Sequence, residues 1–299
     1  MKSPYKNHTL KEFYPVAMRV VNQTVSKYTA KDRTSRIEKH IIPTLGDMKI
    51  KDLTPLKIEH WQFTLFSLRG ADQTRRCKAL LKNILNRAIV HEIISSNPIL
   101  ATATIREPRL DQREVYSKEE LQSILNNSDG WLRLFILTMV SLGLRSGEAI
   151  AVKFTDINWR ARTIKIQRAF RKNRESKTKT GISREVDIPQ GLYDELVKHQ
   201  NSRPTQEFLF VTPKGTPYKD SSYIVRRHFK PLLEKLNIKY KSLYSLRHTY
   251  ATLSLEGGQN INYISNQLGH RDTKTTFEFY IKYLKNDDDI KRADKILSF

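Results

Sequence analysis

Residues 143–148 read Gly-Leu-Arg-Ser-Gly-Glu and directly follow the apolar run Trp131–Leu142. The run has the length and composition of a buried helix, and a glycine after such a run commonly ends it. A second helix is predicted at Arg145–Val152, with Arg145 at its entrance and Glu148 three residues later, close enough to form a pair. The stretch therefore predicts a buried helix followed by charged groups held at the start of the next one.

The residues around this stretch mix helices with short strands. A capping box at residues 117–120, Ser-Lys-Glu-Glu, opens this part of the chain. Alternating apolar and polar residues predict a strand at Thr163–Ala169, and further strands are predicted at Arg184–Ile188 and Phe208–Val211. Helices with short joints are expected from Ser221 onward. The fold class is therefore mainly α with a small antiparallel β-sheet.

The first hundred residues predict helices and little else. Four segments with helical periodicity or helix start signals are Thr9–Val25, Ala30–Ile42, Leu56–Leu68 and Asp72–Ile94. Pro43 is expected to end the second segment, and Thr54-Pro55 to begin the third. Mixed charges and prolines then suggest a linker. We therefore expect a helical domain at residues 1–105, a linker to about residue 112, and a second domain at residues 113–299.

The net charge narrows the class of partner. The 299 residues include 53 Lys and Arg against 31 Asp and Glu, a formal charge of +22. Both parts are basic, with 20 basic and 9 acidic residues in 1–110 and 33 and 22 in 111–299. This favours a polyanion such as nucleic acid over a charge that serves solubility alone.

The cysteine count and the hydropathy exclude disulfide-bonded, cysteine-zinc and membrane-spanning proteins. Cys77 is the single cysteine, so an internal disulfide and a cysteine-based zinc site are excluded. The sequence shows no charged-then-apolar leader and no apolar run long enough to span a bilayer. We therefore expect a cytoplasmic protein with no membrane partner.

Four short patterns could carry chemistry, all in the second domain. They are Gly-Leu-Arg-Ser-Gly-Glu at 143–148, Ser-Lys-Thr-Lys-Thr-Gly at 176–181, Leu-Arg-His-Thr at 246–249, and Leu-Gly-His at 268–270 with Tyr280 ten residues after the histidine. Each pattern alone is weak, because an arginine near a glutamate is most often a salt bridge. Their order and spacing together make the chain resemble the tyrosine recombinases, also called the phage integrase family.

The resemblance implies an architecture and an activity. It implies a helical core-binding domain and a catalytic domain that enclose double-stranded DNA as a C-shaped clamp. It implies a site-specific DNA recombinase or integrase that forms a covalent 3′-phosphotyrosyl intermediate without ATP, a metal or another cofactor, during integration or excision of a mobile element. Such an enzyme would act in the bacterial cytoplasm or nucleoid, or be encoded by a phage.

The resemblance also implies a role for each site residue. Tyr280 would be the nucleophile, and Arg145 and Arg247 would stabilise the negative charge that develops on the phosphate oxygens, because a guanidinium fork matches those oxygens. Lys179 would be the general acid for the departing sugar oxygen. His270 would donate to a nonbridging oxygen or accept the tyrosine proton.

Alternatives remain at three of these positions. Lys177, two residues before Lys179, could be the general acid instead, and Tyr283 is a competing nucleophile. The family usually has histidine three residues before the second arginine, where this chain has Tyr244, so the role of that position in proton transfer is open. His248 lies one residue beyond Arg247 and is expected to pack or cap.

We expect the acidic residues near these motifs to have structural roles rather than catalytic ones. Glu148 is expected to orient Arg145. Residues 287–289 are three consecutive aspartates, but neighbours on a helix point in different directions, so we expect no metal site there.

Contacts to DNA are expected from basic residues in three places. Residues 160–184 hold ten Lys or Arg and one acid, and would lie along phosphates. The basic residues singled out are Arg75, Arg76, Lys78 and Lys82 in the first domain, Arg171, Lys172, Arg174 and Lys177 near the predicted strands, and Arg226 and Arg227 beyond Ser221.

Partners and competing functions follow from the same resemblance. It implies a homotetramer on DNA, joined by a C-terminal helix at Ile290–Phe299 that docks on a neighbouring protomer, and it allows for an accessory DNA-bending protein. A type IB topoisomerase-like enzyme and a catalytically silent DNA-binding regulator are the alternatives.

Overall fold

The computed structural model describes residues 4–105, 114–171, 174–177, 183–270, 272, 273 and 276, with the backbone alone at Arg171 and Lys177. The chain divides into two compact units, Met1–Leu110 and Asp111–Phe299. Each unit has its own buried hydrophobic core. Among the residues just given, no helix is long and apolar enough to cross a membrane.

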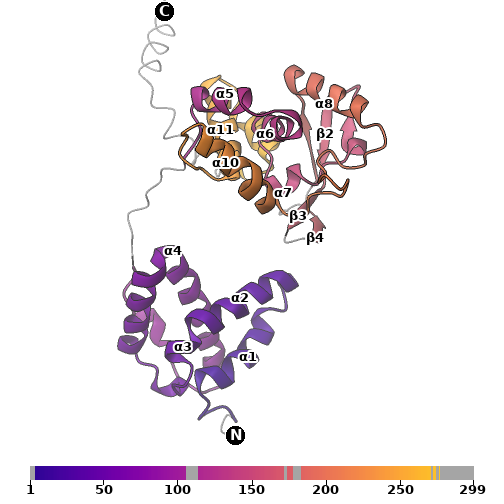
Figure 1. Cartoon of the computed structure of the whole chain (residues 1–299). Coiled ribbons are helices and arrows are strands. Elements are labelled where there is room, and N and C mark those ends of the chain that lie inside the picture. Colours follow the sequence, from indigo (N-terminus) through magenta and orange to yellow (C-terminus); the bar gives the residue numbers. More distant parts are fainter. Residues whose placement is uncertain are drawn as a thin grey trace, which may run out of the picture. The chain divides into compact units, whose positions relative to one another are not determined.

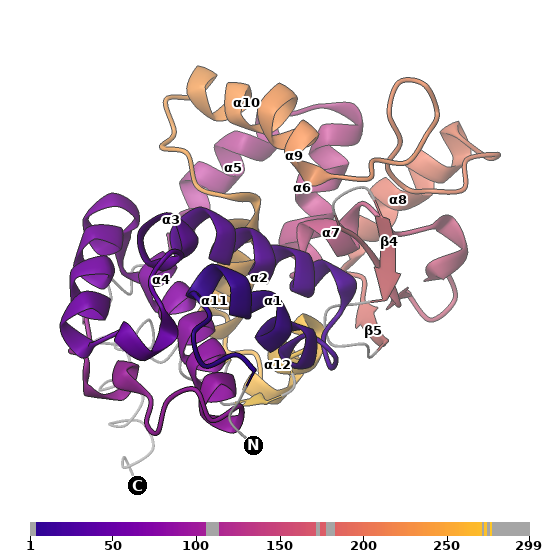
Figure 2. The same cartoon turned by 90° about the horizontal axis from the view of Figure 1, so that it is seen from below.

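The first unit is built from helices (Figure 1). Its elements are α1 (Leu10–Val21), α2 (Lys27–His40), α3 (Ile42–Leu45), the 3₁₀ turn η1 (Ile50–Asp52), α4 (Pro55–Val90) and the 3₁₀ turn η2 (Pro98–Ala101). Both α1 and α2 lie against α4, as a second view shows (Figure 2). The buried indole of Trp61 on α4 donates to the carbonyl of His40 at 2.7 Å and so ties α4 to the end of α2.

Two details of the first unit bear on the predicted helices. Gly70 has non-helical backbone angles (φ 75°, ψ 173°), so α4 consists of two helical segments that meet there. This agrees with the two segments predicted on either side of that glycine. Pro43 does not end α2, which stops at His40: it is the second residue of the short helix α3, because proline is tolerated in a first turn, where the backbone N–H has no partner.

The second unit combines helices with two small sheets. Its helices are α5 (Lys118–Asn126), α6 (Gly130–Leu142), α7 (Ser146–Ala149), the 3₁₀ turn η3 (Phe154–Asp156), α8 (Gln190–Ser202), α9 (Ser221–Ile224), the π-helical segment η4 (Val225–Phe229), α10 (Lys230–Lys235), α11 (Leu243–Glu256) and α12 (Ile261–Leu268). Its strands are β1 (Ile157–Asn158), β2 (Thr163–Ile166), β3 (Arg168–Arg171), β4 (Arg174–Lys177) and β5 (Arg184–Asp187).

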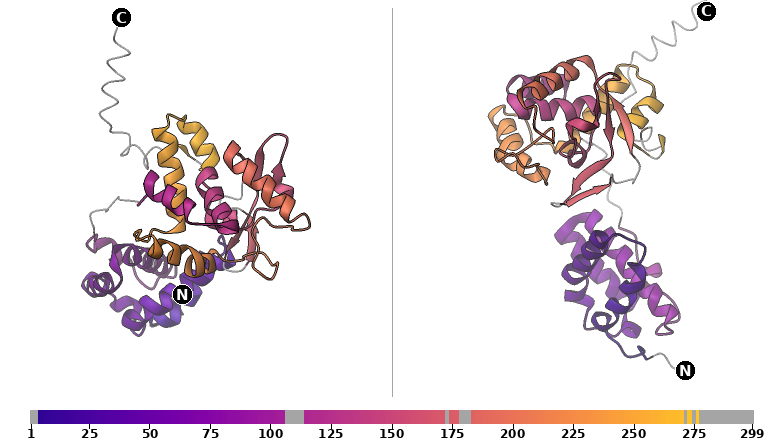
Figure 3. Two further views of the ribbon diagram at one scale, coloured as in Figure 1. Left: turned by 45° about the horizontal axis from the view of Figure 1, so that its top comes forward. Right: turned by 90° about the vertical axis from the view of Figure 1, so that its right-hand side faces the viewer.

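All described strand pairs are antiparallel. One sheet has the order β1-β2-β5, and the other is the hairpin β3-β4, which extends from the body of the unit (Figure 3). The buried Ile164 of β2 pairs with the buried Val186 of β5. The strand predicted at Thr163–Ala169 is wrong in extent: β2 ends at Ile166, and β3 begins at Arg168. Sequence reasoning missed the hairpin β3-β4 because its basic residues show no apolar alternation.

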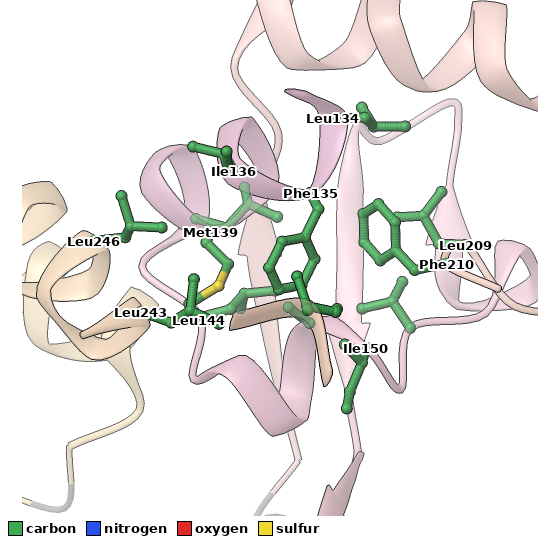
Figure 4. Packing of buried hydrophobic residues seen from close by; sticks show 14 of the residues in the cluster. Leu134, Phe135, Ile136, Met139, Leu144, Ile150, Leu209, Phe210, Leu243 and Leu246 are labelled. Carbon is green, nitrogen blue, oxygen red and sulfur yellow. The ribbon is translucent and has the colours of Figure 1, made fainter. Parts of the chain in front are cut away.

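The core of the second unit forms around α6, which lies against α11 and α8 (Figure 1). The rings of Phe135 and Phe210 meet edge to face, with centroids 5.2 Å apart, and Met139, Leu243 and Leu246 fill the space beside them (Figure 4). This core fixes the end of α6, which Arg145 follows, and the first half of α11, which carries Arg247.

Two further predicted elements of this unit are wrong, one in kind and one in extent. Phe208–Val211 is not a strand: Phe208 and Val211 form isolated bridges to Lys153 and Pro217, and the run is buried in the core. The helix predicted at Arg145–Val152 is only Ser146–Ala149, because Ala151 and Val152 turn into the extended backbone before η3.

Candidate active site

Arg145 is held in place by its own helix entrance. Gly143 ends α6 in the left-handed region (φ 60°), where a Cβ would lie 2.5 Å from the Tyr250 ring. Arg145 then caps α7: its backbone N–H donates to Glu148 Oε2 at 3.1 Å, and its Nη1 donates to Oε1 at 2.7 Å. The predicted pairing of the two side chains is therefore present, with Arg145 20% exposed.

Arg247, in the first half of α11, joins the other two motifs. Its Nη1 donates to the carbonyl of Gly143 and its Nη2 to the carbonyl of Leu268, both at 2.8 Å. These carbonyls lie two residues before Arg145 and two residues before His270. The side chain is 1% exposed. The three motifs, distant in sequence, thus meet at one guanidinium.

Burial and neighbouring charges shift the titration of this cluster. Burial has the largest effect on the pKa of Arg247, and the positive charge of Arg145 has the next largest. Both lower this pKa, which is about 10, so the guanidinium stays charged at neutral pH. Burial raises the pKa of Glu148, but the opposing effect of Arg184, Arg145 and Arg247 is greater and lowers that pKa to about 2. The carboxylate therefore stays ionised and serves as an anchor for cations rather than as a proton donor.

His270 follows the left-handed C-cap of α12 at Gly269 (φ 67°). Its backbone N–H donates to the carbonyl of Ser265, and its Nδ1 makes a 2.7 Å hydrogen bond with Thr276 Oγ1. Burial first, and then the charges of Arg247, Arg145, Arg184 and His248, lower the pKa of His270 to about 4. The imidazole is therefore neutral at pH 7.

Sequence reasoning missed Arg184 as a member of this site. The side chain begins β5, is 11% exposed, and binds Glu148. The signal was present in the strand pattern, since a period of two places Arg184 on the same face as the buried Val186 and Ile188.

Tyr244 and His248 lie on α11 near Arg247. The Tyr244 side chain is 43% exposed, and its ring meets the buried His248 ring edge to face at 4.6 Å. His248 therefore packs against Tyr244.

Several predicted site residues lie outside the described residues or are described in part. Tyr280, Tyr283, Lys179, Lys172 and residues 287–299 lie outside them. Lys177 ends β4 and Arg171 ends β3, but their side chains are not described. Their roles stay predictions.

The basic residues predicted to contact DNA differ in their exposure and in their partners. Lys82, Arg174, Arg226 and Arg227 are exposed, and Arg75 and Arg76 are exposed but pair with Asp72 at 3.9 and 2.8 Å. Lys78 is half-buried, and its ammonium donates to the carbonyl of Ala103 at 2.8 Å, so it holds the end of its own unit. Groups of three or more metal-ligating side chains are absent from the described residues.

The arrangement defines a class of site: guanidiniums fixed by a buried carboxylate and by backbone carbonyls, beside a neutral imidazole. Fixed cations of this kind suit a phosphodiester, because they stabilise charge on its nonbridging oxygens.

Comparisons with known proteins agree with this class. The sequence model of the phage integrase family matches residues 114–287, and that of the phage integrase N-terminal SAM-like domain matches residues 9–66. A XerC-like tyrosine recombinase of Caldanaerobacter subterraneus is 26% identical over 271 residues, covering 79% of this chain and 69% of the relative. The integrase of Mycobacterium phage FRAT1 is 22% identical, covering 87% of this chain and 80% of the relative.

Solved structures share the fold. The Tn1549 transposon integrase in complex with transposon right end DNA has a TM-score of 0.82 at 18% identity, covering 97% of this chain and 100% of that one. A lambda integrase tetramer bound to a Holliday junction has a TM-score of 0.75 at 20% identity, covering 90% and 80%. The chain belongs to the phage integrase family of site-specific tyrosine recombinases.

Proposed function

We propose that this chain cuts and rejoins DNA at specific sites through a covalent bond between Tyr280 and the 3′ phosphate of the cut strand. The observation that carries the proposal is the position of Arg247, whose two Nη atoms bond the backbone beside Arg145 and beside His270. We infer that Arg145, Arg247 and His270 act on one phosphate.

The proposed reaction is a transesterification. The Tyr280 hydroxyl loses its proton and its oxygen attacks phosphorus, the bond to the 5′ oxygen breaks, and Lys179 gives that oxygen a proton. Arg145 and Arg247 stabilise the charge on the nonbridging oxygens. Arg247 has donors left for this, since a guanidinium carries five N–H groups and two are bonded to carbonyls.

The neutral state of His270 fits this reaction. With a pKa of about 4, the imidazole is a weak acceptor for the tyrosine proton, so its neutral N–H fits a hydrogen bond to the phosphate better. In the reverse step a 5′ hydroxyl attacks the phosphotyrosyl bond, which has conserved the energy of the broken ester. Rejoining therefore needs no ATP.

We propose double-stranded DNA as the partner of both units, with exposed basic residues such as Arg75, Arg76 and Lys82 along phosphates. We further propose a tetramer that exchanges strands between two sites, supported by the tetrameric lambda integrase on a Holliday junction that shares the fold. In this assembly the Ile290–Phe299 segment docks on a neighbour. Removing residues 288–299 should weaken assembly more than binding to a single site, and an equal loss of both would contradict this role.

The experiment is a cleavage assay on a suicide substrate, made from DNA that flanks the gene and is shown by footprinting to bind the protein. A nick near the cleavage site lets a short fragment escape, so the covalent adduct accumulates and is seen on a denaturing gel. We expect the adduct from wild type and from Tyr283→Phe, and none from Tyr280→Phe, which should still bind. An adduct that persists in Tyr280→Phe would contradict the nucleophile assignment.

A further inference from the structure

Arg184 lies at the first position of β5, five residues after Lys179 in the sequence. It is 11% exposed, and strand alternation places it on the same face as the buried Val186. A charge removed from water to this extent needs partners, because an unpaired buried charge costs several kcal/mol.

The first partner is Glu148, which Arg184 shares with Arg145. Arg184 Nη2 donates to Oε2 at 2.9 Å, and its Nη1 lies 3.4 Å from Oε1. The same oxygens accept from Arg145, Oε1 from its Nη1 and Oε2 from its backbone N–H. Since each carboxylate oxygen serves both arginines, the orientation of Arg145 depends on Arg184.

The second partner is the turn that carries His270. Arg184 Nε donates to the carbonyl of Gln267 at 2.8 Å. A Cβ on Gly269 would lie 2.8 Å from Arg184 Cδ and 2.9 Å from its Nε, so the side chain lies directly against this turn. One guanidinium thus contacts both the carboxylate that holds Arg145 and the turn that presents His270.

We propose that Arg184 is a positioning residue for strand cleavage, which fixes Arg145 and the His270 turn relative to each other and to the strand that follows Lys179. This rests on the proposed function, since it concerns the same site. The competing explanation is that Arg184 only neutralises the buried Glu148. A lysine would satisfy that need, but a single ammonium cannot reproduce the planar fork on Glu148 together with the bond to Gln267.

The test compares single-turnover cleavage of the nicked substrate at saturating protein in Arg184→Lys and wild type. We expect a rate constant lower by about 100-fold, the size of effect seen when reacting groups are misplaced by about 1 Å. DNA affinity, measured separately, should stay close to that of wild type. Arg203→Gln, which removes an exposed arginine bonded to Gln206, is the matched control and should cleave like wild type. A wild-type rate in Arg184→Lys would overturn the positioning role.

Coupling to Glu148 gives a second criterion. If Arg184 acts through Glu148, the effects of Arg184→Lys and Glu148→Gln on the cleavage rate should not add in the double variant. Strictly additive effects would contradict a shared path to Arg145.

A titration separates this inference from the proposed function. The groups whose charges act on His270 are Arg247, Arg145, Arg184 and His248. Arg184→Gln removes one of these positive charges, so NMR should show the pKa of His270 rising above that of wild type. An unchanged pKa would contradict the placement of Arg184 against the His270 turn. Failure of the wild type to form any adduct would instead overturn the proposed function, and the titration would still decide the position of Arg184.

Discussion

Two groups of arginines, one in each unit, hold their charges in opposite ways. On α4 of the first unit, Arg75 and Arg76 remain 64% and 58% exposed while they pair with Asp72. In the second unit Arg145 and Arg184 are 20% and 11% exposed, and Arg247 is 1% exposed. Exposed pairs contribute little to stability and leave charge available to a polyanion, whereas buried cations need fixed partners. The first arrangement suits affinity, and the second suits chemistry.

The largest effect should come from Arg247→Ala. It removes a charge from the phosphate and leaves the carbonyls of Gly143 and Leu268 without their donors. We expect the single-turnover cleavage rate to fall by about 10³-fold, as when a transition-state donor is lost. Arg76→Ala is the matched control and should retain the wild-type rate at saturating protein. A loss of less than tenfold in Arg247→Ala would place the reaction centre elsewhere.

The next effect concerns pH and the buried carboxylate. The pKa of Glu148 is about 2 in the folded protein against 4.5 ordinarily, so its contribution to stability is present above pH 4.5 and is lost as the pH falls toward 2. The difference corresponds to stabilisation on the order of 3 kcal/mol. Urea unfolding between pH 2 and 4.5 should therefore depend more steeply on pH in wild type than in Glu148→Gln. Equal slopes would show that Glu148 is not held by its arginines.

His270 adds to this pH dependence at higher pH. Its pKa is about 4 in the folded protein against 6.5 ordinarily, so the folded state binds fewer protons than the unfolded state in that window. Stability should then decrease as the pH falls from 6.5 to 4. His270→Gln should flatten the curve in that window, and an unchanged curve would contradict the burial of a neutral imidazole.

A smaller effect should come from Gly143→Ala, which tests how tightly the reaction centre is built. The added Cβ would require φ 60° and would meet the Tyr250 ring at 2.5 Å. We expect a loss of about 2 to 3 kcal/mol in the free energy of unfolding, from overpacking and backbone strain together. Gly215→Ala, at φ 76° with nothing within 4 Å, carries the strain without the clash and should cost about 1 kcal/mol. Equal losses would mean that the turn before Arg145 can relax.

The smallest effect should come from the exposed cations of the first unit. Replacing Arg75 and Arg76 together by alanine should weaken DNA binding modestly and lower the slope of log affinity against log salt by about 2. The cleavage rate at saturating protein should not change. A large fall in that rate would remove the distinction between the two units.

Local signals explain what the sequence could predict. Arg145 and Glu148 are three residues apart, and the cap of α4 at Thr54-Pro55 depends on adjacent residues, so both follow from the chain itself. The strand period places Arg184 on the buried face of β5, but its contacts span 36 and 83 residues, and no local pattern specifies these partners. The hairpin β3-β4 has basic residues where strand alternation would be expected, so tertiary context decides it.

The most direct measurement is the identity of the amino acid bonded to DNA. Trypsin cleavage after Lys274, Lys282 and Lys285 puts Tyr280 in the peptide 275–282 and Tyr283 in the peptide 283–285. Nuclease treatment of the adduct leaves a nucleotide on the tyrosine, which mass spectrometry can place. We expect the added mass on the peptide 275–282, at Tyr280. A modified peptide 283–285, or an unmodified 275–282 in a protein that cuts DNA, would contradict the proposed reaction.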